Sequence, residues 1–161
     1  MTGEKAGASG PTVRKARVGD VEAIKGLVDH FAREQRMLPR PLSEVYENIR
    51  DYYVVEDAGA VVGSAALHVF WEDLAEIRAL AVAEKYQGRG LGRGLVAACC
   101  HEARGMGIRR VFALTFLPGF FHGLGFADIE KERLPHKIWS DCVRCPLFPE
   151  CGEEAVILEV C

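Results

Sequence analysis

The sequence predicts a single domain of the α/β (α+β) class, on three observations. An apolar, strand-like segment, Leu74–Val82, runs into a glycine-rich turn, and an apolar helix follows at once from Leu91. Strand and helix patterns succeed one another in the order β-α-α-β-β-β-α-β-α-β-β. The 161 residues, of which 49% are hydrophobic, are enough for one buried core.

A strand and two helices open the domain. Val13–Arg17 alternates between polar and apolar residues, which predicts a strand. Asp20 is a suitable N-cap for a helix with apolar residues at helical spacing. These residues are Val21, Ile24, Leu27, Val28 and Phe31. Pro39 and Pro41 interrupt the chain, and Pro41 suits the start of a second helix that runs to Arg50.

A hairpin and the remaining elements follow. Tyr52–Glu56 and Ala60–Phe70 are rich in β-forming residues and are joined by a turn, which predicts a hairpin. The later elements are the strand Leu74–Val82, a helix from Leu91 to near Gly105 or Gly107, a strand Val111–Phe116, a short helix Pro118–Leu124 and a last strand Ala155–Val160. The glycine turn therefore joins the fourth strand to the third long helix.

Composition and charge exclude several classes of function. The formal net charge of -3 argues against nucleic acid or an acidic membrane as the main partner. No apolar run reaches the length of a membrane span. Residues 1–11 are small and polar and lack the apolar segment of a secretory signal, so we expect a disordered tail there and the folded domain at 12–161. These features predict a cytoplasmic protein.

The glycine turn carries the first chemical signal. Gln87, Gly90 and Gly92 leave backbone N–H groups with little side-chain bulk at a helix N-terminus, where unpaired amides and the helix dipole favour an anion. Arg89 and Arg93 add positive charge, so the turn suits a pyrophosphate. It is not a P-loop, since no Gly-Lys-Ser/Thr follows, and the strands that precede it do not fit the dinucleotide-binding fingerprint.

The strand, the Gln-x-x-Gly-x-Gly turn and the helix together resemble motif A of the GCN5-related N-acetyltransferases. The resemblance implies their fold, a mixed central sheet with flanking helices and a crevice between strands that splay near the glycine turn. It also implies acetyl-CoA as the acetyl donor and no required metal. The residues expected to bind acetyl-CoA are Leu80, Ala81, Val82, Gln87, Gly88, Arg89, Gly90, Leu91, Gly92 and Arg93.

Four longer segments narrow the resemblance. Met37–Glu47, Leu74–Val82, Val111–Phe126 and Leu134–Cys142 are similar to the short amino-acid N-acetyltransferases that make N-acetylglutamate. This implies acetylation of the α-amino group of L-glutamate, the first step of arginine biosynthesis. Two alternatives stay open: an acetyltransferase of another small amine or a protein N-terminus, and a non-catalytic acetyl-CoA sensor. Members of the superfamily often form homodimers, which makes a homodimer a further expectation.

Glu76 is the expected general base. Glutamate arrives as an ammonium, and a base must take a proton before the nitrogen attacks the thioester. A carboxylate among apolar side chains, here Leu74, Ile77 and Leu80, is poorly solvated and accepts a proton more readily. The resembled enzymes place their catalytic glutamate at this point of the strand. The alternative is an exposed strand residue, or an ion pair with a nearby arginine, Arg78 or Arg89.

Two further groups are expected to take part in the reaction: one stabilises the transition state, and the other protonates the leaving group. From the superfamily, a backbone N–H near Leu80–Val82 is expected to stabilise the negative oxygen of the tetrahedral intermediate. Many members also protonate the departing thiolate with a tyrosine four residues before a Gly-Phe pair. Here Phe121 stands at that position and cannot donate a proton, which leaves Thr115, His122 or solvent.

Cations are needed for the carboxylates of glutamate. Arg40, between two prolines, matches the arginine that the resembled family uses there, and arginine suits bidentate contacts with carboxylates. Arg78, Lys137 and Arg144 are lesser candidates, and for Arg78 and Arg144 a solvated surface charge is favoured. Glu76 and Arg78 are two residues apart, so both leave the same face of their strand, which suits a shared substrate site or a structural salt bridge.

The six cysteines fall into two groups. Cys99 and Cys100 lie in the apolar helix and are predicted core residues. The others raise a zinc site as an alternative, with Cys142, Cys145 and Cys151 as ligands and His136 or Cys161 as the fourth. Because their spacing is irregular and a second Cys-x2-Cys is missing, reduced thiols are favoured.

Overall fold

The computed structural model describes residues 10–134 and 153–160. The strands of these segments are β1 (Thr12–Lys15), β2 (Tyr52–Asp57), β3 (Ala60–Trp71), β4 (Leu74–Val82), β5 (Arg110–Thr115), β6 (Ala127–Ile129) and β7 (Glu154–Glu159). Their α-helices are α1 (Val21–Arg33), α2 (Leu42–Glu47), α3 (Leu91–Gly105) and α4 (Pro118–His122).

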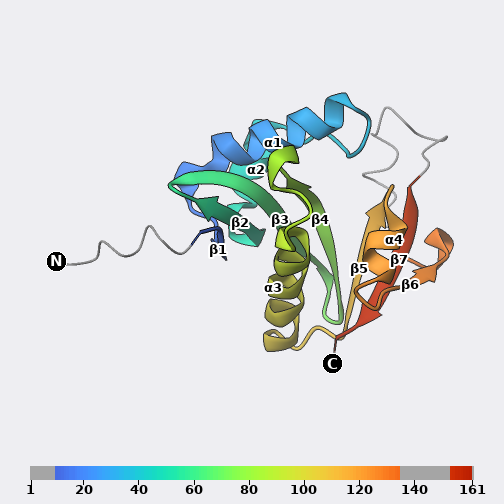
Figure 1. The fold of residues 1–161 in the computed structure, drawn as a ribbon. Helices are drawn as coiled ribbons and strands as arrows, with labels where there is room; N and C mark the ends of the chain where they lie inside the picture. Colours follow the sequence, from blue (N-terminus) through green and yellow to red (C-terminus); the bar gives the residue numbers. More distant parts are fainter. Residues whose placement is uncertain (1–9, 135–152, 161) are drawn as a thin grey trace.

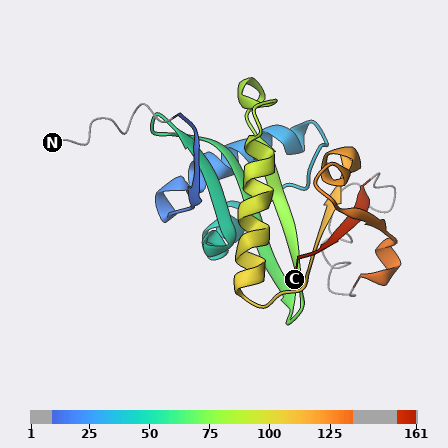
Figure 2. The ribbon, with the colours of Figure 1, turned by 60° about the horizontal axis from the view of Figure 1, so that its bottom comes forward.

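The described strands form one mixed sheet in the order β1-β2-β3-β4-β5-β7-β6. Neighbouring strands are antiparallel except for β4 and β5, which are parallel because α3 connects them. α1 and α2 cover one face of the sheet and α3 the other (Figure 1 and Figure 2). The sequence therefore predicted the fold class and the mixed sheet with flanking helices correctly.

Several predicted boundaries differ by one to three residues from the structure, and hydrogen bonds explain the differences at the end of α2 and the start of α1. The predicted second helix ends early, at Glu47, because Asn48 leaves the helical conformation and its side-chain amide donates to the carbonyl of Glu44 at 2.9 Å. Asp20 stands at the N-cap position of α1 but caps the preceding 3-10 turn instead. Its carboxylate accepts the N–H of Arg17 at 2.7 Å and two bonds from Arg14 at 2.9 and 3.0 Å.

The two faces of the sheet bury separate cores. On the face of α1 and α2, Ile24 and Val28 pack against Val54 of β2 and Ala66 of β3. The α3 face is larger and is built from the apolar sides of β2 to β5. Cys99 and Cys100 are buried there as predicted, and burial raises the pKa of Cys99 to about 12, so it packs as an uncharged side chain. No helix of the described segments is long and apolar enough to span a membrane.

The parallel pairing of β4 with β5 is short, and this opens the molecule. It extends only from Leu74 opposite Arg110 to Glu76 opposite Phe112. Beyond this point the carboxyl ends of the two strands diverge, with the end of α1 and the start of α3 beside the gap (Figure 1). The crevice between splayed strands is therefore present, at the edge where ligands bind parallel strand pairs.

Candidate active site

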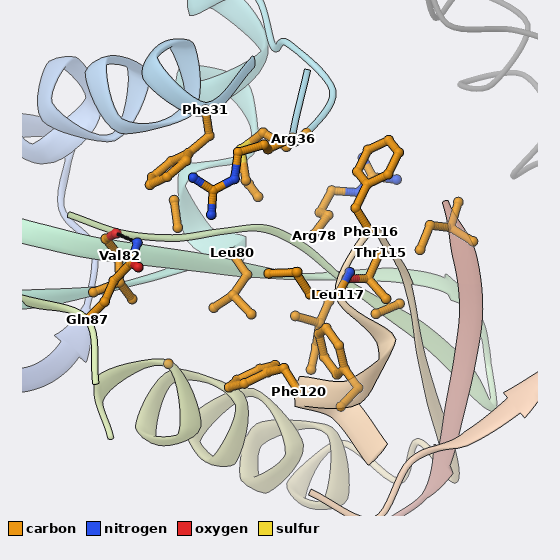
Figure 3. A pocket seen from close by; sticks show the side chains of 18 of the residues that line it. Phe31, Arg36, Arg78, Leu80, Val82, Gln87, Thr115, Phe116, Leu117 and Phe120 are labelled. Atoms are coloured by element: carbon orange, nitrogen blue, oxygen red, sulfur yellow. Dashed lines mark hydrogen bonds between the residues drawn. The ribbon is translucent and has the colours of Figure 1, made fainter. Parts of the chain in front are cut away.

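A cavity of about 560 Å³ lies between the diverging ends of β4 and β5. Its walls come from the end of α1 and the loop after it, β4, the glycine turn, β5 and α4 (Figure 3). The volume lies within the usual range for sites that bind a cofactor or small substrate. The sequence reasoning missed Phe31 of α1 and Arg36 of the loop after it, because no motif marks residues that become neighbours of β4 only through packing.

The glycine turn closes one end of the cavity. Gly88 and Gly90 adopt φ angles of +80° and +82°, which L-residues with a side chain rarely adopt, and Gly90 is the N-cap of α3. The side-chain amide of Gln87 donates to the carbonyl of Val82 at 2.9 Å and so ties the turn to the end of β4. The N-terminus of the 15-residue helix α3, where the unpaired amides and the positive end of the helix dipole lie, therefore faces the cavity.

Nine of the ten residues expected to bind acetyl-CoA line this cavity. They are Leu80, Ala81, Val82, Gln87, Gly88, Gly90, Leu91, Gly92 and Arg93. Arg89 does not line it; its guanidinium stacks over the ring of Tyr86, 4.9 Å from the ring centre.

A β-bulge divides β4 in the cavity wall. Ser64 of β3 lies opposite Ala81 and Ala66 opposite Arg78, so Ala79 and Leu80 together face one residue. The bulge reverses the alternation of the strand, so Leu80 packs on the α3 face. The prediction that Leu80 lies among the apolar neighbours of Glu76 is wrong for this reason. It is also wrong for Ile77, which packs on the α3 face because adjacent residues of a strand point to opposite faces.

Glu76 and Arg78 form a buried ion pair inside the cavity wall. Glu76 is only 6% exposed, and its Oε1 accepts Arg78 Nη2 at 2.7 Å and Nε at 3.0 Å. The guanidinium of Arg78 also lies 5.4 Å from the ring centre of Phe70. Both side chains also line the cavity. The sequence indicated a salt bridge and a shared substrate site as alternatives, and this pair has the position for both.

Arg40 reaches the same cavity from the loop before α2. Its side chain is buried, and Nη1 contacts Glu44 Oε2 at 2.6 Å. Tyr52 is also buried on this face, in register with Ala66, which in turn lies opposite Arg78. Burial raises the pKa of the Tyr52 hydroxyl against the opposing effect of Arg40, so the hydroxyl keeps its proton. Sequence pattern indicated Tyr52 only as a strand residue.

The far side of the cavity is aromatic. Phe121 is buried, with the rings of Phe120 and Phe126 each 5.1 Å away, so it contributes packing and no proton. Thr115 lines the cavity, and its hydroxyl oxygen accepts the N–H of Leu117 at 2.8 Å. His122 does not line the cavity; its Nε2 contacts Asp128 at 2.6 Å, which removes it as a proton source for the thiolate.

Several predicted residues lie outside the described part of the chain. These are the substrate candidate Lys137, the weaker candidate Arg144, the cysteines Cys142, Cys145 and Cys151, their possible fourth ligands His136 and Cys161, and most of the predicted tail.

A model of the acetyltransferase (GNAT) family matches residues 24–126, which contain β4, the glycine turn and α3. The chain belongs to the GNAT family. An uncharacterized N-acetyltransferase of Chlorobaculum tepidum is 41% identical over 90% of this chain and 94% of its own length. The amino-acid acetyltransferase of Mycobacterium tuberculosis is 40% identical over 83% of this chain and 78% of its own length.

Solved structures agree with this GNAT assignment. A Mycobacterium tuberculosis protein in complex with CoA and a second ligand superposes with a TM-score of 0.80 at 35% identity, covering 92% of this chain and 98% of that one. The N-acetylglutamate synthase of Neisseria gonorrhoeae, complexed with coenzyme A and N-acetyl-glutamate, gives a TM-score of 0.86 at 27% identity. This chain covers 35% of that longer protein. The GNAT chain described here is thus an N-acetyltransferase that uses acetyl-CoA.

Proposed function

We propose that this GNAT enzyme transfers the acetyl group of acetyl-CoA to the α-amino group of L-glutamate, as the entry step of arginine biosynthesis. The observation that carries the proposal is one cavity lining with a buried carboxylate, Glu76, the buried Arg40 and the largely buried Arg78, whose side chain is 10% exposed. Such a wall suits an acceptor with one amine and two carboxylates. The name of the Mycobacterium tuberculosis relative supports an amino acid as the acceptor, and that of the Neisseria gonorrhoeae protein supports glutamate.

Acetyl-CoA would occupy the gap between the splayed strands. The amides at the start of α3, with Arg93, would hold its pyrophosphate. The edge of β4 beyond Glu76 has no partner on β5, so the amides of Leu80–Val82 that do not point toward β3 are available to the pantetheine and the thioester oxygen. The aromatic wall with Phe120 would cover the thioester from the other side.

The transfer itself needs one base and one stabilised oxygen. Glu76 would take a proton from the ammonium, and the free amine nitrogen would form a bond to the thioester carbon. The carbonyl oxygen then carries the negative charge, which the backbone amides of β4 stabilise. When the carbon–sulfur bond breaks, the nitrogen, which is positively charged after the attack, loses its second proton and becomes the amide nitrogen. This proton would pass through solvent or the hydroxyl of Thr115 to the departing thiolate.

The two arginines would orient the acceptor. In the structure each contacts an internal carboxylate, Arg40 that of Glu44 and Arg78 that of Glu76. A bound glutamate would share or replace these partners with its own carboxylates, since the planar guanidinium binds carboxylates in a bidentate manner. Amines without a carboxylate would lack this contact.

An Arg40→Ala variant tests the acceptor assignment. We expect the KM for glutamate to rise about tenfold or more, because a charge-assisted contact is lost, while the KM for an uncharged amine stays unchanged. Arg33→Ala, an exposed arginine of α1, is the matched control. An equal rise of both KM values would make Arg40 a structural residue and overturn its role in acceptor choice.

A further inference from the structure

The β-bulge in the cavity wall is held in a conformation that its sequence disfavours. Ala79 has a φ of +56°. Of the three described residues other than glycine with positive φ, it is the one inside a strand. A side chain at such a φ crowds the backbone, so alanine adopts it only where the surrounding structure imposes it.

Ser64 supplies that constraint from β3. Its side chain is fully buried, and Oγ donates a hydrogen bond to the carbonyl of Ala79 at 3.2 Å. The neighbours of Ser64 on its strand are Gly63 and Ala65, and β2 places Val54 opposite it. A buried hydroxyl in apolar company is unfavourable unless it is hydrogen-bonded, and an alanine would pack there equally well. The bond to the bulge is therefore the physical reason for a serine at this position.

The bulge determines how the part of β4 that carries Glu76 is oriented relative to the part after the bulge, Leu80–Val82. Before it, Ala75 and Ile77 pack on the α3 face and Glu76 lies on the opposite face; after it, Leu80 and Val82 pack on the α3 face. An unbroken strand would place residue 80 on the side of Glu76. The relation between the base and the amides of Leu80–Val82 thus depends on the backbone at Ala79.

We propose that Ser64 is a positioning residue for acetyl transfer: its hydrogen bond holds Ala79 in the left-handed conformation and so aligns the β4 amides that stabilise the thioester oxygen with Glu76. This rests on the roles assigned above to Glu76 and the β4 amides. Ser64 does not line the cavity, so it acts through the backbone of the bulge.

A double-mutant cycle of Ser64→Ala and Ala79→Gly tests this inference. In the natural background, Ser64→Ala is expected to lower kcat about tenfold. The KM for acetyl-CoA should change little, because misaligned amides weaken the stabilisation of the transition state more than they weaken the binding of the donor. Glycine adopts positive φ freely, so in the Ala79→Gly background the same change should cost about threefold or less. The exposed Ser43→Ala is the control.

Two outcomes would contradict the inference. An unchanged kcat with only a lower Tm, or an equal loss in both backgrounds, would overturn it. Should Ser64→Ala not fold, Ser64→Cys keeps the volume with a weaker donor and must show the same kcat loss and the same rescue. The rates are compared with whichever acceptor turns over best, so a wrong assignment of glutamate leaves this test intact.

Discussion

At the residue scale, the site depends on two ion pairs, Glu76 with Arg78 and Arg40 with Glu44. Glu76, Arg78 and Arg40 all line the cavity, as expected from the motifs around them. The sequence indicated the pair of Glu76 with Arg78 as an alternative. It did not indicate the pair of Arg40 with Glu44, although these residues are four apart, because Arg40 precedes the first residue of α2 and lies outside the helical spacing. Tyr52 was indicated only as a strand residue; it is buried on this side of the sheet and does not line the cavity.

The charge of Glu76 is the residue-scale feature with the largest expected effect. Glu76→Gln keeps the size and the acceptor oxygen but removes the base, so we expect kcat to fall by about 10²–10⁴-fold. The affinity for acetyl-CoA, measured by calorimetry, should change little, because the described contacts of Glu76 are with Arg78. Glu47→Gln, an exposed glutamate of α2, is the control. A nearly unchanged kcat would place the base elsewhere.

At the element scale, the sequence predicted most accurately the connection from β4 through the glycine turn to α3. The glycine turn at the start of α3 was recognised because its geometry follows from residue type: positive φ at Gly88 and Gly90 and a free helix N-terminus. The bulge in β4 was not, because its decisive residue is an alanine, which carries no sign of positive φ in the sequence. β6 was not located, because its three residues are too few to show alternation.

Replacing a glycine of the turn should weaken acetyl-CoA binding. At Gly90 an added Cβ meets no atom within 4 Å, so the effect of Gly90→Ala comes from its φ of +82° alone. A cost of about 1–2 kcal/mol for this conformation would raise the Kd for acetyl-CoA roughly tenfold. Gly105→Ala, at the end of the same helix with equal space, should leave Kd unchanged. Equal Kd values for the two variants would remove the turn from the donor site.

The ion pair between β1 and the start of α1 predicts a pH dependence of stability. The Arg14 guanidinium holds the pKa of Asp20 below its usual range. A carboxylate with a lowered folded-state pKa stabilises the fold above the unfolded value, about 3.9, and this contribution is lost as the pH falls through the folded value.

Asp20→Asn should therefore lower the free energy of unfolding by about 2 kcal/mol at pH 7, and the difference should shrink toward pH 3 and below. Urea unfolding at both pH values measures it. Asp29→Asn, which breaks a surface pair with Lys25, should cost less than about 0.5 kcal/mol. A loss that is the same at pH 7 and at low pH would show that the charge of Asp20 does not stabilise the fold.

At the scale of the whole molecule, the site exists because the parallel pairing of β4 with β5 ends after a few residues and the two strands then separate. The element order and the helix faces followed from apolar periodicity, but the length of the β4–β5 ladder is a packing result. Within the cavity, donor and acceptor sides then divide by position along β4. The glycine turn and Leu80–Val82 lie toward its end, and Glu76 and Arg78 before the bulge.

The central claim is that this cavity joins acetyl-CoA to the amino group of glutamate. Its most direct test is the rate of thiol release from acetyl-CoA with glutamate, glutamine, other amino acids, spermidine and a short peptide, with the product identified by mass. The account predicts turnover with glutamate and formation of N-acetylglutamate, at a kcat/KM well above that for spermidine or the peptide. Turnover confined to amines without a carboxylate, or none while acetyl-CoA still binds, would contradict it.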